Sequence, residues 1–137
     1  MRGVAVLAVL AVAGCDPSVN DAPDIPEVTR VIPPDGAVYE GVQTRLLEND
    51  LVNFLVEMRG ARAPADVDAY ARCAAAQYAL IRGYGFARHI RTNVNEKGGI
   101  WRGDAVYTVS PALPRGSRNL DAEVVVATCR QDGIPTV

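Results

Sequence analysis

Three cysteines and a single histidine are the residues of this chain best suited to chemistry. A thiol can be acylated, can pair in a disulfide, or can act as a nucleophile beside a histidine that takes its proton. Cys73 and His89 would form such a nucleophilic pair only if the thiol were free and the two side chains lay close together. We favour other roles for both: a disulfide for Cys73, and for His89 a place on the surface of the protein.

Other catalytic arrangements find little support in the sequence. The chain has no G-x-S-x-G turn, and one histidine with two widely separated cysteines matches no metal-ligand spacing. Gly83-Tyr84-Gly85 follows an expected helix, whereas a phosphate cradle uses the N–H groups at a helix start. We therefore predict a protein that is not an enzyme and has neither a metal site nor a cofactor.

The first fourteen residues have the pattern of a secretory signal peptide. Met1-Arg2 precedes twelve uncharged residues, GVAVLAVLAVAG, and Cys15 comes next. The apolar run is too short to cross a bilayer as a mature helix, but a basic start, a short apolar stretch and small residues are typical of a cleaved leader. We predict that residues 1–14 are removed and that the mature chain is exported.

Val12-Ala13-Gly14-Cys15 resembles the lipobox of bacterial lipoproteins, in which the cysteine is acylated and becomes the new N-terminus. The resemblance implies that Cys15 carries acyl chains, including palmitate, and anchors the protein to a membrane. The sequence leaves open whether the anchor lies in the inner or the outer membrane. Asp16 resembles the inner-membrane retention signal of enteric lipoproteins and favours the inner one. A cleaved leader that releases a soluble protein, or an uncleaved anchor, are the alternatives.

The mature chain divides into a tether and one domain. Residues 15–36 are rich in proline and acidic side chains and poor in large apolar ones, which is typical of an extended spacer. A proline-rich ligand for a partner is the alternative interpretation of this stretch. Residues 37–137 have the length of a single small domain.

The segment from Pro64 to Phe86 carries the clearest helical pattern. Proline suits the first position of a helix, and Gly83 can end one. Apolar or small residues recur at helical spacing and predict one stripe that packs on a sheet; they are Val67, Tyr70, Ala71, Ala74, Tyr78 and Ile81. We predict a single core helix.

The remaining apolar segments read as strands. Residues 42–47 and 51–58 predict a hairpin, residues 86–94 and 100–110 a second pair around a glycine turn, and residues 122–129, AEVVVATC, a last strand. The order is strand, strand, helix, strand, strand, strand. The fold class is therefore α+β: a two-layer sandwich of a mainly antiparallel sheet of about five strands and one helix.

Cys73 and Cys129 are expected to form a disulfide. An exported compartment favours pairing of the two cysteines that remain when Cys15 is acylated. Cys73 lies beside the apolar stripe of the helix and can point towards the sheet expected to hold Cys129. Two buried free thiols are the alternative.

The charges are unevenly distributed. Residues 16–68 hold eleven acidic residues against four arginines, whereas residues 82–118 hold seven basic residues against two acidic ones. The basic segment can bind an acidic partner or anionic lipid, can face the acidic segment of its own chain, or can simply be solvated. We take it as a candidate partner contact formed by Arg88, His89, Arg91, Trp101 and Arg102.

Residues 50–110 are similar to small uncharacterised envelope lipoproteins of Gram-negative bacteria. The likeness rests on Arg59-Gly60, on Cys73-Ala74 and on the exit Gly83-Tyr84-Gly85-Phe86. It implies the fold and export, and brings no activity or catalytic residue with it.

We expect a membrane-anchored envelope lipoprotein that faces the periplasm and has a binding or structural role. Its partners would be the lipid bilayer, through Cys15, and an unidentified envelope protein, and not nucleic acid, which lies across the export barrier. A carrier of lipid or another small ligand, with a pocket between helix and sheet, is the alternative.

Overall fold

The computed structural model describes residues 30–136. The predicted signal peptide, Cys15 and most of the predicted tether lie outside this range. Neither of the two helices within it has the length and apolar composition that a membrane span requires. The fold class predicted from the sequence, α+β with a five-stranded antiparallel sheet, is confirmed.

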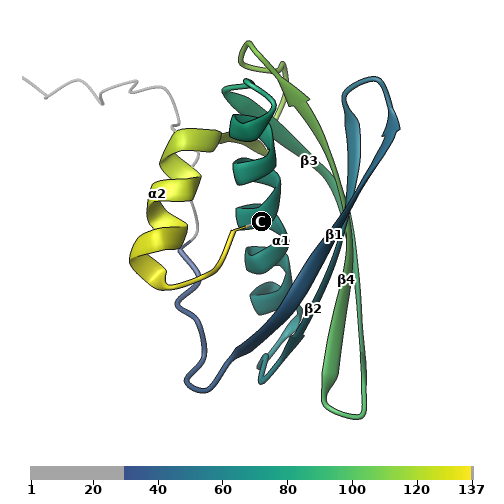
Figure 1. The fold of residues 1–137 in the computed structure, drawn as a ribbon, viewed down its shortest axis with the longest axis vertical. Coiled ribbons are helices and arrows are strands. Elements are labelled where there is room, and N and C mark those ends of the chain that lie inside the picture. The colour runs from purple at the N-terminus through teal and green to yellow at the C-terminus, as the bar shows by residue number, and fades with distance from the viewer. Residues whose placement is uncertain (1–29, 137) are drawn as a thin grey trace, which may run out of the picture.

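Four long strands form most of the sheet (Figure 1). They are β1 (Val38–Glu48), β2 (Leu51–Arg59), β3 (Phe86–Lys97) and β4 (Ile100–Ser110), and a short strand, β5 (Asn119–Asp121), completes it. Every pairing is antiparallel and the order is β1-β2-β4-β3-β5. Both predicted hairpins are present, because turn residues separate segments whose apolar side chains alternate.

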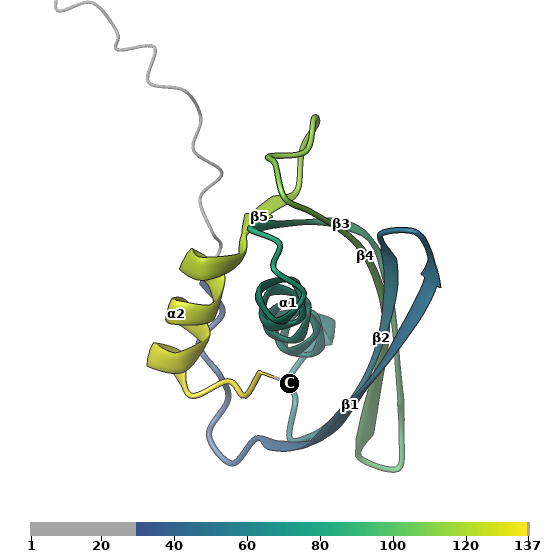
Figure 2. The ribbon, with the colours of Figure 1, turned by 45° about the horizontal axis from the view of Figure 1, so that its top comes forward.

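Helix α1 (Pro64–Ile81) lies in the hollow of the curled sheet, and α2 (Ala122–Asp132) covers its far side (Figure 2). The sheet side of α1 meets aromatic and branched side chains: Tyr70 packs edge-on against Tyr39, and Tyr78 against Phe54. Fully buried alanines continue around the helix to the α2 side. A helix that is apolar on most of its circumference is expected at the centre of a domain.

The sheet and α1 approach one another most closely at Gly103 of β4. A Cβ built at this glycine would lie 2.7 Å from Cγ1 of Val67 and 2.9 Å from Cγ2 of Val56. Real Cβ atoms do not come so close, so only glycine fits here without displacing α1.

An ion pair marks the start of α1. Asp66 accepts hydrogen bonds from the backbone N–H of Arg62 and from its guanidinium, with Arg62 Nη2 to Asp66 Oδ1 at 2.8 Å. The hydrogen bonds from Arg62 lower the pKa of Asp66, although burial opposes this. The carboxylate also lies at the positive end of the helix dipole.

The prediction of a final strand at residues 122–129 is wrong, because these residues form most of α2. The Asp121 side chain accepts from the backbone N–H of Val124 at 3.1 Å and caps the helix start, and Gly133 ends the helix with a left-handed φ of 71°. The buried residues Ala122, Val125, Val126 and Cys129 recur at helical spacing. The domain therefore has two helices and three layers, and the fifth strand is the short β5.

Cys73 and Cys129 form a disulfide, the pairing predicted from the sequence. The element that carries Cys129 differs from the prediction: the bond joins α1 to α2 and not α1 to the sheet. Both cysteines are almost completely buried. The bond therefore ties α2 to α1, although the two cysteines are 56 positions apart in the sequence.

The first described residues pack on the domain. Nε of Arg30 donates to Asp132 at the end of α2 at 2.9 Å, and the carbonyl of Ile32 accepts from Nη2 of Arg62 at 2.7 Å. Val31 packs against the core. The chain therefore reaches β1 along the α2 side of the molecule.

Loss of the disulfide should lower the free energy of unfolding by as much as about 4 kcal/mol, because the bond closes a loop with a sequence separation of 56. Denaturant unfolding of the wild type, with and without reductant, measures this. A Cys73→Ser/Cys129→Ser variant is the control and should not respond to reductant. Equal stability of the two proteins without reductant would contradict the prediction.

Candidate functional site

The face of the sheet turned away from α1 is the candidate site, and we call it the open face. Both helices lie on the opposite side (Figure 2). Along β2, the fully or nearly fully buried residues Val52, Phe54, Val56 and Met58 point to α1. Side chains alternate along a strand, so the residues between them belong to the open face.

Cross-strand pairing aligns the open-face residues in rows. One row runs from Gly41 through Glu57 and Arg102 to Asn95, across four strands. The neighbouring row runs from Gln43 through Leu55 and Asp104 to Asn93. Residues directly opposite one another in an antiparallel pair have adjacent side chains. The two rows form one continuous polar surface around Leu55.

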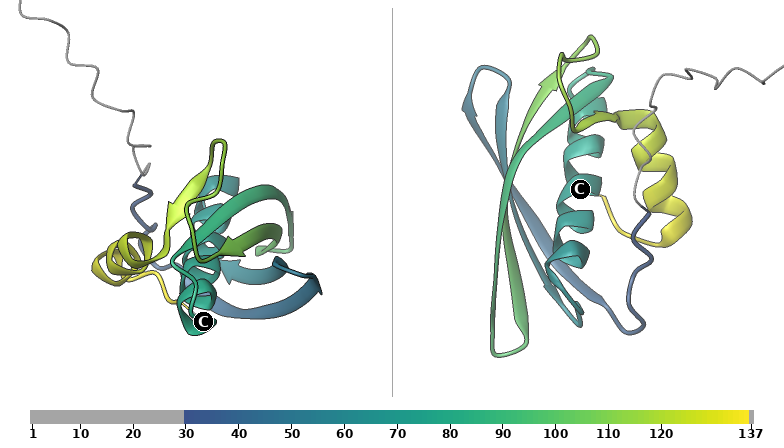
Figure 3. Two further views of the ribbon diagram at one scale, coloured as in Figure 1. Left: turned by 90° about the horizontal axis from the view of Figure 1, so that it is seen from above. Right: turned by 180° about the vertical axis from the view of Figure 1, so that it is seen from behind.

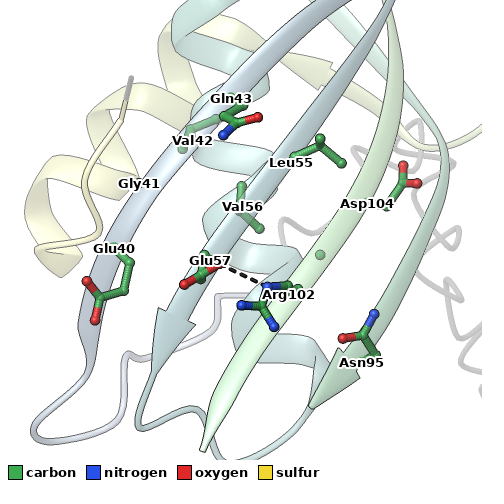
Figure 4. Close-up of a pocket in the computed structure, with 11 residues that line it drawn as sticks. Glu40, Gly41, Val42, Gln43, Leu55, Val56, Glu57, Asn95, Arg102 and Asp104 are labelled. Carbon is green, nitrogen blue, oxygen red and sulfur yellow. Dashed lines mark hydrogen bonds and ion pairs between the residues drawn. The ribbon is translucent and has the colours of Figure 1, made fainter. Parts of the chain in front are cut away.

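A groove of about 700 Å³ crosses this surface (Figure 4). Side chains and backbone from β1, β2, β3 and β4 line it. Gly41 lies at a β-bulge after Tyr39, and a Cβ added there would meet no atom within 4 Å. Because Gly41 has no side chain, no side chain from this position blocks the β1 side of the groove.

Two ion pairs hold the charged side chains of the groove region in place. Nε of Arg102 donates to Oε2 of Glu57 at 3.0 Å, and Nη1 of Arg91 lies 3.5 Å from Oδ1 of Asp104. The same Asp104 oxygen accepts from Nδ2 of Asn53 at 2.6 Å. The surface thus presents exposed donors and acceptors of both charges, which suits recognition of a polar partner.

The five predicted contact residues do not share one face. Arg91 and Arg102 lie on the open face, in the ion pairs described above. Arg88 also belongs to this face, opposite Thr108, but the loop after β4 passes over it: a Cβ at Gly116 would be 3.0 Å from its Nη2. The single surface expected from the sequence is therefore divided.

His89 and Trp101 lie on the helix side of the sheet. Trp101 packs against the core opposite Met58, which is fully buried. A bulge between His89 and Arg91 shifts the alternation, so that two residues near one another in sequence point to opposite faces. The sequence did not reveal this bulge.

His89 belongs to a polar cluster that joins β3 to α1. Its Nε2 is 2.7 Å from Oγ1 of Thr92, and this hydroxyl donates to Oδ1 of Asp68 at 2.6 Å. The hydroxyl proton is used in the bond to Asp68, so Nε2 of His89 must be the donor to Thr92. The imidazole lies beside the ring of Tyr107, whose pKa is raised by burial. The cluster is a cross-link between elements and has only limited exposure.

The geometry bears on two kinds of chemistry, a cysteine nucleophile beside His89 and a metal site. Cys73 is in a disulfide, so it is not a free thiol that His89 could activate. Within residues 30–136, no three His, Cys, Asp or Glu side chains gather as a metal site would require. The open face offers binding groups instead.

Sequence reasoning missed the central residues of the open face. Asn53, Leu55 and Glu57 alternate with the core residues of β2, and this alternation is visible in the sequence. Asp104 is one of the two acidic residues of the basic segment 82–118, and it contacts both Asn53 and Arg91.

The molecule is thus a small α+β domain with one helix-covered and one open sheet face, and comparison with known proteins gives its family. A family model described as the YNQ4 C-terminal domain matches residues 39–133, and the chain belongs to this family. An uncharacterised 26.9 kDa protein in the nqo8 5′ region of Paracoccus denitrificans is 30% identical over 103 residues. The match covers 71% of this chain and 40% of that relative. No solved structure matches.

Asp104→Ala should destabilise the protein more than Arg102→Ala. The Asn53 side chain donates to Asp104 and to the carbonyl of Ala105, and Asn53 is only 8% exposed. Removing Asp104 leaves one of the two N–H groups of the Asn53 amide without an acceptor, and an unpaired buried donor costs about 1–3 kcal/mol. The pair of Arg102 with Glu57 is exposed, and such pairs contribute at most about 1 kcal/mol. Chemical denaturation of the two variants checks this, and equal losses would contradict it.

Proposed function

We propose that this chain is a lipid-anchored protein of the cell envelope whose domain faces the periplasm and binds another envelope component without catalysing a reaction. The observation that carries the binding role is the groove on the open face. Both helices pack on the other side of the sheet, so a large partner can approach this face without displacing either of them.

The anchoring part of the proposal rests on the sequence. The apolar leader ends at Val12-Ala13-Gly14-Cys15, and acyl chains on Cys15 would hold the domain at a membrane, with Asp16 favouring the inner one. The disulfide between Cys73 and Cys129 supports export, because such bonds persist in oxidising compartments. Residues 16–29 would then act as the spacer between bilayer and domain.

We prefer the binding role to that of a lipid or small-ligand carrier. A carrier of the kind considered above needs room between α1 and the sheet. Val67, Ala71 and Ala74 on α1 are fully buried, and Gly103 brings the sheet into direct contact with the helix. The groove that is present lies on the opposite face of the sheet.

Cys15→Ser should abolish membrane anchoring through acyl chains. In cells given labelled palmitate, the wild-type protein should become labelled and the Cys15→Ser protein should not. The wild type should also remain in membranes washed with alkaline carbonate. Equal labelling of both proteins would contradict the lipoprotein assignment. It would not test the binding role of the open face, which depends on crosslinking from the groove.

A photoreactive amino acid at Leu55 should crosslink a defined envelope component, since this residue lies in the groove. Position 124 is the matched control, because Val124 is exposed on α2, away from the open face. Arg102→Glu should weaken the crosslink from position 55, because it reverses a charge in the groove; it also replaces the exposed ion pair with Glu57 by two like charges on adjacent strands. The same products from positions 55 and 124, or a crosslink that Arg102→Glu leaves unchanged, would count against the open face.

A further inference from the structure

Two loops at one end of the domain combine exposed apolar side chains with arginines. The first covers residues 82–85 and follows Ile81, the last residue of α1, and the second covers residues 111–118, between β4 and β5. Ile81 is 64% exposed and Leu113 is 66% exposed. Together the loops contain Arg82, Arg115 and Arg118 and no acidic residue, and the exposed Asp121 and Glu123 follow the second loop at the start of α2. We call Ile81, Leu113 and these three arginines the loop end.

Strand pairing places the two loops side by side. Phe86, directly after the first loop, pairs with Ser110, directly before the second, and also with Asp121 of β5. The backbone N–H of Ala122 donates to the carbonyl of Gly85 at 2.9 Å. Figures 1 and 3 show both loops at the same end of the molecule, opposite the turn between β3 and β4.

Internal hydrogen bonds hold the second loop in one shape. Nδ2 of Asn119 donates to the carbonyls of Pro114 and Gly116, at 2.7 and 2.9 Å. The carbonyl of Arg118 accepts from the backbone N–H of His89 on β3 at 3.1 Å. Leu113 is therefore presented to solvent by an ordered loop, and its contact with a surface would require little further loss of conformational entropy.

We propose that the loop end docks on the anionic headgroups of the bilayer that holds the acyl chains of Cys15. Exposed apolar side chains with arginines in the same loops are the combination that binds such an interface, with Ile81 and Leu113 entering it and the arginines meeting lipid phosphates. The inference rests on the proposed lipid anchor. It adds an orientation for the domain, which an anchor alone does not give.

The length of chain outside the described residues allows this contact. From Cys15 to Arg30 the chain can span at most about 50 Å. Arg30 is fixed at the end of α2 by Asp132. Helix α2 runs from Ala122, next to the loop end, to Asp132. A helix of this length rises roughly 16 Å, so the tether can return from Arg30 to a bilayer at the loop end.

The charges favour the two loops over the neighbouring hairpin tip. The turn between β1 and β2 lies at the same end of the sheet, since the carbonyl of Asp50 accepts from the backbone N–H of Val109. The end of β1 beside this turn carries the exposed Leu46 and Leu47 but also Glu48, and Asp50 lies in the turn itself. Like charges repel, so an anionic surface should be met by the two basic loops and less by the acidic turn.

Quenching by brominated lipids tests the contact in the full-length protein isolated from membranes and reconstituted into vesicles. Trp101→Phe removes the native fluorophore, and Leu113→Trp reports from the loop end. Lys97→Trp, at the turn between β3 and β4, is the matched control. With phosphatidylglycerol present, we expect Leu113→Trp to be quenched at least about twofold more than Lys97→Trp, and the difference to shrink at high salt.

The outcomes separate docking from anchoring. Protein that stays on neutral phosphatidylcholine vesicles but shows equal quenching at both positions would overturn docking and leave the anchor intact. Protein that leaves neutral vesicles yet shows the loop-end quenching on phosphatidylglycerol would support docking and overturn the anchor. Binding to neither vesicle would overturn both. Arg115→Gln/Arg118→Gln should reduce the selective quenching, and an unchanged signal would contradict the role of the arginines.

Discussion

The burial of α1 from two sides is the constraint on which the rest of the structure depends. The sheet curls around one side of this helix and α2 closes the other, so side chains around most of its circumference must be small or apolar. The run of buried alanines keeps the helix thin, and Gly103 lets β4 approach it directly. Because alanine also favours helix, the same residues provide local structure and close packing.

This arrangement explains why one face of the sheet is left open. Helix α1 lies between the sheet and α2, so both helices are on the same side of the sheet, and the disulfide between Cys73 and Cys129 keeps α2 there. Nothing among residues 30–136 is packed over the groove at Leu55, and its neighbours are polar pairs that tolerate water. The polar rows are consistent with a surface exposed in the free protein and able to meet a partner.

Much of the fold followed from local signals in the sequence. The two hairpins have turn residues between alternating segments, and α1 has a proline at its start and a glycine after its end. The segment AEVVVATC was predicted as a strand because its branched residues favour strands. The residues that flank it favour a helix more strongly. Asp121 caps the helix and Gly133 terminates it. Strand propensity depends on context, and here capping and burial against α1 prevail.

The sequence of α1 also contains a sign that a second helix covers it. Ala69, Cys73 and Ala76 recur at helical spacing beside the stripe that was expected to face the sheet, and all three are buried. A lone sheet-facing stripe does not require small residues there, whereas a covering helix does. Pairing of Cys73 with Cys129 was predictable from the cysteine count and the expected export, but its position between two helices was not.

The candidate site was harder to predict because it depends on which face of the sheet each side chain points to, and a bulge changes this. Arg88, His89 and Arg91 are close in sequence, yet the bulge after His89 and the loop over Arg88 give the three side chains different surroundings. The proposed docking of the loop end relates this geometry to the membrane. The strands run away from the loop end, so docking there would leave the open face at the side of the domain. A partner anchored in the same bilayer could then reach the groove without entering the space between the domain and the lipid.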